Sequence, residues 1–177
     1  AADSGTPLEQ GAMRMFAHTP EISKGLTAFA GSLKQNRSLP DRLVELVRLR
    51  VAFHNQCRSC MAIRYKDGQE DGITEDLVCS LEKPMEADNL SDAEKAAIQY
   101  GELFATNHLA INDGIYDNLR KYFSESEIVE LSMTVAFFVG FGRLAASYHM
   151  VEELPESFQA NEKETLTPWG NDSIIVR

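Results

Sequence analysis

Apolar residues recur through most of the chain at the three- and four-residue spacing that places side chains on one face of a helix. In residues 19–34 they follow a threonine and a proline, which suit the cap and the first position of a helix. Residues 43–53 are apolar nearly all round, which predicts a helix that is mostly buried. Two Ser-x-x-Glu capping boxes, at residues 91–94 and 124–127, precede two further long helical patterns.

Shorter helical patterns lie between these segments, at residues 57–66 and 74–83. The pattern from about residue 125 to 149 contains Gly140 and Gly142, which are costly inside an isolated helix and therefore predict close approach of a neighbouring backbone. No segment alternates convincingly in the manner of a strand. We therefore predict an all-α fold of six to eight helices.

The 177 residues fit one domain with a core of its own. We assign residues 1–154 to a single helical domain. The tail, residues 155–177, is too polar and too interrupted by proline to belong to the core. Two interpretations of the tail stay open: it clasps a partner subunit, or it is disordered. The apolar character of residues 43–53 and 139–146 exceeds what a small domain must bury, which predicts that subunits associate.

Acidic residues outnumber basic ones, 27 against 17, which gives a formal net charge of −10. The basic residues are scattered, so nucleic acid and an anionic membrane surface are not expected partners. The most apolar stretch, residues 131–146, is interrupted by Ser132, Thr134 and Arg143 and falls short of the ~18 to 20 apolar residues of a membrane helix. The first residues lack the basic and apolar regions of a signal peptide. We therefore expect a cytoplasmic protein.

Three cysteines, Cys57, Cys60 and Cys79, make an odd number that argues against a secreted disulfide framework. In the Cys57/Cys60 pair the sulfurs lie about one helical turn apart on one face, close enough to bond. A helix that begins near Cys57 would also favour the thiolate through its unpaired N–H groups. The pair therefore predicts redox chemistry and an intramolecular disulfide, with Cys79 as a bystander. Two buried, inert helical cysteines are the alternative.

Charged residues near the pair can tune its reactivity. Arg64 stands four residues after Cys60, so a continuous helix would place its guanidinium on the cysteine face, where it can stabilise a thiolate. Glu45 is a carboxylate in an otherwise largely apolar segment. An exposed ion pair with Arg42 or Arg48, three residues away on either side, is the simpler interpretation of Glu45.

His54 stands three residues before Cys57, at the end of the apolar segment. It is either a catalytic group or a residue that caps and packs the helix end. With the three cysteines it also offers four ligands of the kind that tetrahedral zinc accepts. Because Cys79 lies on a separate segment, we expect no metal site.

The residues that carry these features resemble the core motif of the alkyl hydroperoxidase D (AhpD) / carboxymuconolactone decarboxylase superfamily. The matching positions are residues 39–52, Asn55, Cys57 and Cys60. Two further stretches, residues 18–21 and 90–94, are similar to helix starts of that family. The similarity covers roughly residues 13–154 and leaves the tail outside it.

This resemblance implies an all-α AhpD-like fold that assembles as a trimer or hexamer. In the peroxidase branch a glutamate, two cysteines and a histidine form a proton relay. By position, Glu45 matches the relay carboxylate, Cys60 the cysteine that attacks peroxide and Cys57 the resolving cysteine. Arg64 stands at the histidine position; it stays charged, so it can hold a thiolate but cannot pass a proton. We expect a Glu45–Arg64 ion pair beside the sulfurs, with His54 as the candidate substitute for the histidine.

We therefore predict a thiol-dependent oxidoreductase that reduces a hydroperoxide, or exchanges disulfides, through Cys57 and Cys60. No GxGxxG or Walker pattern occurs, so no nucleotide or flavin cofactor is expected and a thiol reductant must re-reduce the pair. Two alternatives stay open. One is a carboxymuconolactone decarboxylase-like lactone enzyme, which does not depend on a cysteine pair, and the other is a non-catalytic oligomeric helical protein that keeps the family scaffold.

Overall fold

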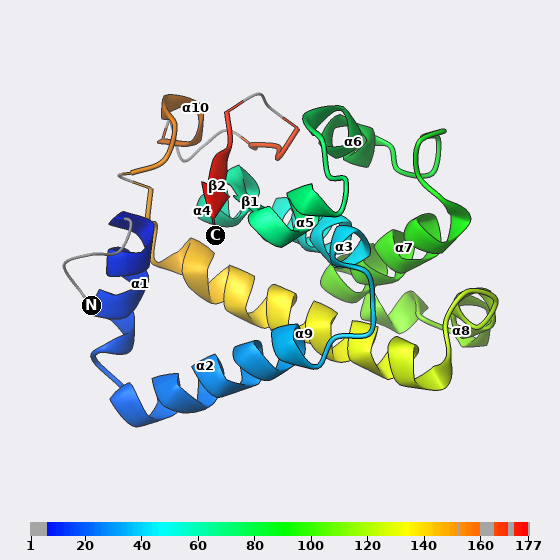
Figure 1. Cartoon of the computed structure of the whole chain (residues 1–177), viewed down its shortest axis with the longest axis horizontal. Helices are drawn as coiled ribbons and strands as arrows, with labels where there is room; N and C mark the ends of the chain where they lie inside the picture. The colour runs from blue at the N-terminus through cyan, green and yellow to red at the C-terminus, as the bar shows by residue number, and fades with distance from the viewer. Residues whose placement is uncertain (1–6, 152, 160–164, 170–171, 177) are drawn as a thin grey trace.

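The computed structural model describes residues 7–151, 153–159, 165–169 and 172–176. The expectation about a signal peptide concerns the first residues, and residues 1–6 lie outside this described part. Within it the chain is mostly helical, as predicted, with ten α-helices, two short 3-10 helices and two three-residue strands (Figure 1). The helix count exceeds the expected six to eight because four of the helices, α4, α5, α6 and α10, have only four or five residues.

The elements follow one another in this order: α1 Pro7–Phe16, α2 Pro20–Gln35, α3 Asp41–His54, α4 Arg58–Ala62, β1 Ile63–Tyr65, α5 Lys66–Glu70, α6 Glu75–Cys79, η1 Ser80–Glu82, α7 Asp92–Thr106, η2 His108–Ala110, α8 Asp113–Leu119, α9 Glu125–Ser147, α10 Glu156–Gln159 and β2 Ile174–Val176.

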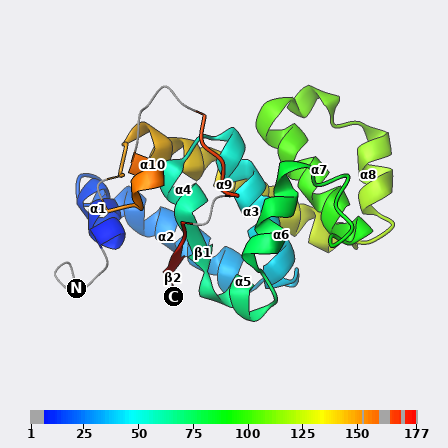
Figure 2. The same cartoon turned by 90° about the horizontal axis from the view of Figure 1, so that it is seen from above.

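Helix α3 is the centre of the fold. It packs against α7 and α9 and also contacts α4 and α5, while α1 lies at one end of the molecule and α8 at the other (Figures 1 and 2). Residues 43–52 are buried without interruption, including the four wholly inaccessible side chains of Leu46, Val47, Leu49 and Val51. Each such side chain contributes about 1.5 to 3 kcal/mol when it leaves water. The predicted buried helix is therefore confirmed.

Both predicted capping boxes are present. The hydroxyl of Ser91 accepts from the N–H of Glu94 at 3.2 Å, and the Glu94 carboxylate accepts from the N–H of Ser91 at 2.8 Å. Ser124 and Glu127 repeat this exchange at 3.3 and 2.8 Å. Each box satisfies two backbone donors that the first turn of a helix leaves unpaired, and so fixes where α7 and α9 begin.

The two glycines of α9 have different surroundings. A Cβ at Gly142 would lie closer to Nδ2 of Asn55 than the two groups can approach. Asn55 itself is held in place, because it donates to the carbonyl of Phe138 at 3.0 Å and accepts from Nε of Arg143 at 3.2 Å. A Cβ at Gly140 would meet nothing within 4 Å. The predicted close approach is therefore right for Gly142 and wrong for Gly140.

A short parallel pair of strands, β1 and β2, departs from the expected all-α fold. Ile63 lies opposite Ile174, and Tyr65 lies opposite Val176. Both views show β2 beside β1 and α4 (Figures 1 and 2). The expectation that no segment forms a strand is wrong here, because three residues are too few to show an alternating pattern and the partner strand lies far along the chain.

The described part of the tail packs against the helices. Phe158 is 3% exposed and joins a second apolar cluster with Met61 and Ala62. The ring of Trp169 lies 4.9 Å from that of Phe53, measured between centroids. The expectation that the tail lies outside the core is therefore wrong for these residues, because a few apolar side chains in a polar segment are enough to anchor it. The domain boundary at residue 154 stays a prediction.

Helix α9 packs against α2, α3, α4 and α7 as a core helix does. Among the described helices it is nevertheless long and apolar enough, by length and composition, to cross a bilayer. It also leaves Val129, Met133 and Leu144 exposed. The sequence expectation of no membrane segment stays a prediction.

Substituting the two α9 glycines by alanine should separate close packing from helix propensity. We expect Gly142→Ala to lower the free energy of unfolding by about 1 to 2 kcal/mol, because overpacking against Asn55 outweighs the helix propensity of alanine. Gly140→Ala is the matched control and should be neutral or stabilising by up to about 1 kcal/mol. Urea denaturation measures both, and equal stability of the two variants would contradict the packing argument.

Candidate active site around the Cys57–Cys60 disulfide

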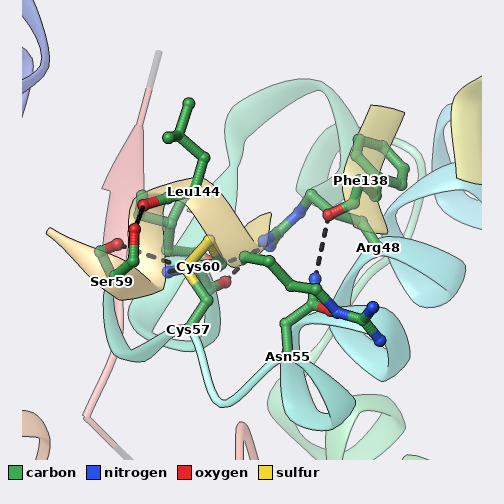
Figure 3. The surroundings of a disulfide bond; sticks show 10 residues. Arg48, Asn55, Cys57, Ser59, Cys60, Phe138 and Leu144 are labelled. Carbon is green, nitrogen blue, oxygen red and sulfur yellow. Dashed lines mark hydrogen bonds between the residues drawn. A yellow bond between two sulfur atoms is a disulfide. The ribbon is translucent and has the colours of Figure 1, made fainter. Parts of the chain in front are cut away.

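Cys57 and Cys60 form a disulfide, with their Cα atoms 5.2 Å apart (Figure 3). Cys57 is the N-cap of α4 and has an extended backbone, as a cap residue does. Its sulfur accepts from the N–H of Cys60 at 3.3 Å. The predicted pairing, and the prediction that the cysteines begin a helix, are confirmed. This helix ends at Ala62, however, rather than near residue 66.

The turn between α3 and α4 sets the direction in which the pair points. Gln56 adopts the left-handed conformation, with φ 49°, which residues other than glycine seldom do. Its side chain donates to the carbonyl of Leu166 and accepts from the N–H of Leu166, both at 3.1 Å. A described residue of the tail therefore holds the turn that precedes Cys57.

The two cysteines differ in access. Cys57 is 0% exposed, whereas Cys60 is half-buried and lines a cavity of about 390 Å³. Most of the cavity wall is apolar and includes the aromatic side chains of Phe137, Phe138 and Phe141 from α9. A small molecule in this cavity can reach Cys60, whereas Cys57 is shielded.

A second cavity, of about 430 Å³, also touches the cysteine turn. Its wall shares Asn55, Ser59, Ala145 and Met150 with the first cavity but is more polar, with Arg58, His149 and Thr165 among its residues. The cysteine turn therefore borders both a mainly apolar and a more polar cavity.

Glu45 and Arg48 form a buried ion pair one helical turn apart on α3. Both carboxylate oxygens of Glu45 accept from Arg48 at 2.7 Å, and one also accepts from the N–H of Tyr65 at 3.2 Å. The simpler interpretation named Arg48 as a partner correctly but expected an exposed pair, and both side chains are at least nine-tenths buried. The expected Glu45–Arg64 ion pair is wrong.

Arg48 also contacts the cysteine turn directly. Its guanidinium donates to the carbonyl of Cys60 at 2.6 Å (Figure 3) and to that of Ile63 at 2.7 Å. It lies over the ring of Tyr65, 4.9 Å from the centroid. Burial alone would lower the pKa of Arg48, but the charge and hydrogen bonds of Glu45 outweigh burial and raise the pKa above its usual value. Arg48 therefore stays charged.

Arg64 does not lie on the cysteine face. Because α4 gives way to β1 at Ile63, the helical spacing that predicted a shared face is interrupted. The guanidinium of Arg64 is wholly buried and pairs with Glu75 at 3.0 and 3.1 Å. It also donates to the carbonyls of Met61, at 2.7 Å, and Pro168, at 2.6 Å. Arg64 thus joins α6 and the tail to the strand that follows the cysteines.

His54 faces α7. Its Nε2 lies 3.4 Å from a carboxylate oxygen of Glu102, which also accepts from Arg50 at 2.9 Å. The contact with His54 and, against the effect of burial, the guanidinium of Arg50 lower the pKa of Glu102 to about 2. Neither cavity that touches the cysteine turn has His54 in its wall. The imidazole therefore has a structural partner on α7, and nothing in its position brings it to the sulfurs.

Cys79 is a free, exposed cysteine on α6 whose thiol lies 3.7 Å from the carbonyl of Trp169. The four residues of the zinc alternative do not converge, because Cys57 and Cys60 bond each other and His54 faces Glu102. In the described ranges no group of three or more His, Cys, Asp or Glu side chains is placed to hold a metal ion.

Sequence reasoning underrated Arg48 and did not identify the aromatic wall of the cavity. The signal for Arg48 was present, since a three-residue spacing on a helix brings Glu45 and Arg48 together. Burial of the pair could not be predicted, because the few charged residues of an otherwise apolar helix usually lie on its solvent-exposed side. The signal for the wall was the run of Phe137, Phe138 and Phe141 in α9, which is equally typical of a core.

Fold and site together define a class: mostly helical proteins that carry a Cys-x-x-Cys pair beside a cavity. Residues 20–103 match the sequence model of the carboxymuconolactone decarboxylase family. The matched residues, 84 of 177, are just under half of the chain, and the fold of the described part is AhpD-like.

Two curated relatives are uncharacterized proteins. Rv2313c of Mycobacterium tuberculosis is 29% identical over 121 residues, which are 67% of this chain and 42% of Rv2313c. The chain thus spans less than half the length of that relative. YnjA of Escherichia coli is 24% identical over 144 residues, which are 81% of this chain and 77% of YnjA.

Two solved structures share the fold. One is the AhpD core of an uncharacterized peroxidase-related protein from Ralstonia eutropha, with a TM-score of 0.66 and 18% identity over 84% of this chain and 78% of that chain. The other is the protein of unknown function ATU0492 from Agrobacterium tumefaciens, with a TM-score of 0.64 and 21% identity over 76% of this chain and 92% of that chain. At these identities the likeness establishes the fold alone.

The lowered pKa of Glu102 predicts part of the acid sensitivity of the fold. Because the folded-state pKa, about 2, lies below the ordinary 4.5, the stabilisation is fully present above pH 4.5 and is lost as the pH falls through 2. We expect Glu102→Gln to flatten the decrease in stability between pH 4.5 and 2. Urea denaturation at several pH values measures this slope, and a slope equal to that of the wild type would contradict the assignment.

Proposed function

We propose that this protein is a thiol-dependent oxidoreductase whose Cys57/Cys60 pair cycles between dithiol and disulfide as it reduces a hydroperoxide. The observation that carries the proposal is the unequal access of the two bonded cysteines: Cys60 opens onto an apolar cavity, whereas Cys57 is buried behind it. A peroxidatic cysteine must meet its substrate, and a resolving cysteine needs only to reach the first sulfur.

The cycle begins when the Cys60 thiolate attacks one peroxide oxygen. A sulfur–oxygen bond forms and the O–O bond breaks, which gives a sulfenic acid on Cys60 and, after the leaving oxygen takes up a proton, an alcohol. Cys57 then attacks the Cys60 sulfur, and water leaves as the disulfide forms. Two electrons have passed from the thiols to the peroxide, and a thiol reductant returns them by thiol–disulfide exchange.

The cavity supports an organic hydroperoxide with an apolar substituent as the substrate class. Phe137, Phe138 and Phe141 offer a surface that gains from contact with hydrocarbon, which hydrogen peroxide lacks. The peroxidase-related protein from Ralstonia eutropha that shares the fold supports a peroxidase reaction, and the cavity supports the substrate class. Disulfide exchange with a small apolar disulfide uses the same sulfur and the same cavity.

Proton transfer is the weak part of this site. Glu45 is the carboxylate that the family relay would use, and both of its oxygens accept hydrogen bonds from Arg48. Arg64 is paired with Glu75, and His54 faces Glu102. Because the groups at the relay positions are engaged elsewhere, water is the source of the proton for the leaving oxygen in our proposal. We therefore propose modest turnover, since positioned acid–base catalysis contributes about a hundredfold or more.

The proposed setting is the reducing cytoplasm, where a thiol donor is available to the disulfide. We also propose that the protein assembles as a homo-trimer or homo-hexamer. Supporting this, Ile22 on α2 is 75% exposed, and Val129 and Met133 on α9 are each more than half exposed. Val129 and Met133 stand four residues apart and share a face of α9, and exposed apolar side chains of this kind are typical of contacts between subunits.

The function is tested by hydroperoxide consumption with a dithiol donor, using cumene hydroperoxide and hydrogen peroxide in parallel. Cys60→Ser should abolish consumption. Cys57→Ser should allow a single oxidation of Cys60 to sulfenic acid but no turnover, because nothing resolves it. Cys79→Ser is the matched control and should keep full activity. Full activity in Cys60→Ser, or faster use of hydrogen peroxide than of cumene hydroperoxide, would overturn the proposed reaction or the proposed substrate class.

The assembly is tested by light scattering at micromolar concentration. One chain has a mass of 19.7 kDa, and we expect a particle of about three times that mass or more. Met133→Glu should shift the population towards smaller particles, because it places a charge among the exposed apolar side chains. A wild-type protein that scatters as a single chain would refute the proposed assembly.

A further inference from the structure

The redox cycle described above gives no task to the buried pair of Glu45 and Arg48. We propose that Arg48 is the positioning residue of the redox site: held by Glu45, it fixes the backbone of Cys60 and supplies the positive charge that stabilises the Cys60 thiolate. This inference rests on the proposed function, because it concerns the dithiol state of the same cysteine pair.

The first argument is mechanical. A helix ends with carbonyl groups that have no partner within the helix, and α4 is only five residues long. Arg48 donates to the carbonyls of Cys60 and Ile63 at 2.6 and 2.7 Å. One side chain of the central helix α3 therefore fastens both the second cysteine and the start of β1. Loss of these two hydrogen bonds should leave the cysteine turn less firmly held.

The second argument is electrostatic. Four covalent bonds separate the carbonyl oxygen of Cys60 from its own sulfur, so the donating nitrogen of Arg48 lies within roughly 8 Å of that sulfur. Arg48 lines the cavity at Cys60 and also, together with Glu45, a neighbouring cavity of about 180 Å³, whereas Glu45 is not part of the wall at Cys60. The cationic member of the pair is thus the one that reaches the cavity at Cys60. Because the region is buried, water screens this attraction only weakly.

The third argument concerns the kind of charge. A histidine at such a site would gain and lose its proton near neutral pH, but Arg48 stays charged. Its effect on the thiolate should therefore be constant across the range in which Cys60 titrates. Other charged or titratable groups near the turn are Glu45 on α3, Cys57, Arg58, Arg64 and Tyr65 around α4 and β1, Glu9 on α1, and Arg143 and His149 in or after α9.

The matched control is Arg50, two residues further along the same helix. It is buried, binds the Glu102 carboxylate at 2.9 and 3.3 Å and donates to the carbonyl of Leu81 at 2.8 Å. Arg50 therefore repeats the contacts of Arg48, a carboxylate and a backbone carbonyl, on the side of α3 that faces away from the cysteine turn.

The experiment measures the pH dependence of Cys60 alkylation by iodoacetamide, in a Cys57→Ser/Cys79→Ser background where Cys60 is the one remaining cysteine. Removing both charges with Glu45→Gln/Arg48→Gln avoids leaving a buried unpaired carboxylate. We expect this double variant to raise the apparent pKa of Cys60 by about one unit, a tenfold loss of thiolate at pH values below the pKa. Arg48→Lys keeps the charge, so it should shift the pKa less, and Arg50→Lys should not shift it.

A second measurement uses chains with all cysteines present and the equilibrium of the Cys57–Cys60 disulfide with glutathione. Since a stabilised thiolate favours the reduced form, the double variant should shift this equilibrium about tenfold towards the disulfide. Circular dichroism establishes that each variant is folded. A folded double variant with the pKa and equilibrium of its background would overturn the proposal. So would an equal shift in Arg50→Lys, or a larger shift in Arg64→Lys than in Arg48→Lys.

Neither measurement uses a peroxide. If the wild type fails to consume hydroperoxide but the shifts at Arg48 are found, the proposed function fails and the role of Arg48 in a redox-active dithiol stands. If hydroperoxide is consumed and the shifts are absent, the reverse holds.

Discussion

The buried ion pair of Glu45 and Arg48 is the constraint around which the redox site is organised. Two charges in the interior lose their hydration. This loss costs several kcal/mol per ion unless hydrogen bonds replace the lost water. Here the replacements are specific backbone groups: the N–H of Tyr65 and the carbonyls of Cys60 and Ile63. These hydrogen bonds form only when the cysteine turn and β1 lie against α3. The ion pair on α3 therefore determines where the disulfide lies.

This constraint also changes the chemistry that the family resemblance suggests. Both oxygens of the Glu45 carboxylate accept hydrogen bonds from the guanidinium, so Glu45 supports Arg48. In the proposed reaction the fixed positive charge of Arg48 favours the Cys60 thiolate, and water protonates the leaving oxygen.

Much of the fold was accessible from the sequence because it depends on local signals. The capping boxes at Ser91 and Ser124, the apolar continuity of α3 and the Cys57–Cys60 spacing each act within a few residues. The errors concern contacts between distant segments. The position of Arg64 was misjudged because α4 stops at Ala62, where β2 pairs with the following residues. Burial of Phe158 could not be read from a polar tail, since it depends on Met61 and Ala62.

The contacts between the tail and the cysteine turn can form only late in the synthesis of the chain. Arg64 and Pro168 are 104 residues apart in sequence, and Gln56 and Leu166 are 110 apart. At roughly 5 to 20 residues per second, on the order of 5 to 20 seconds pass on the ribosome between the two ends of each contact. During that interval the thiols of Cys57 and Cys60 emerge without the segment that later packs beside them. The cell's oxidants and thiols therefore meet this pair first in a nascent chain, before the tail has docked.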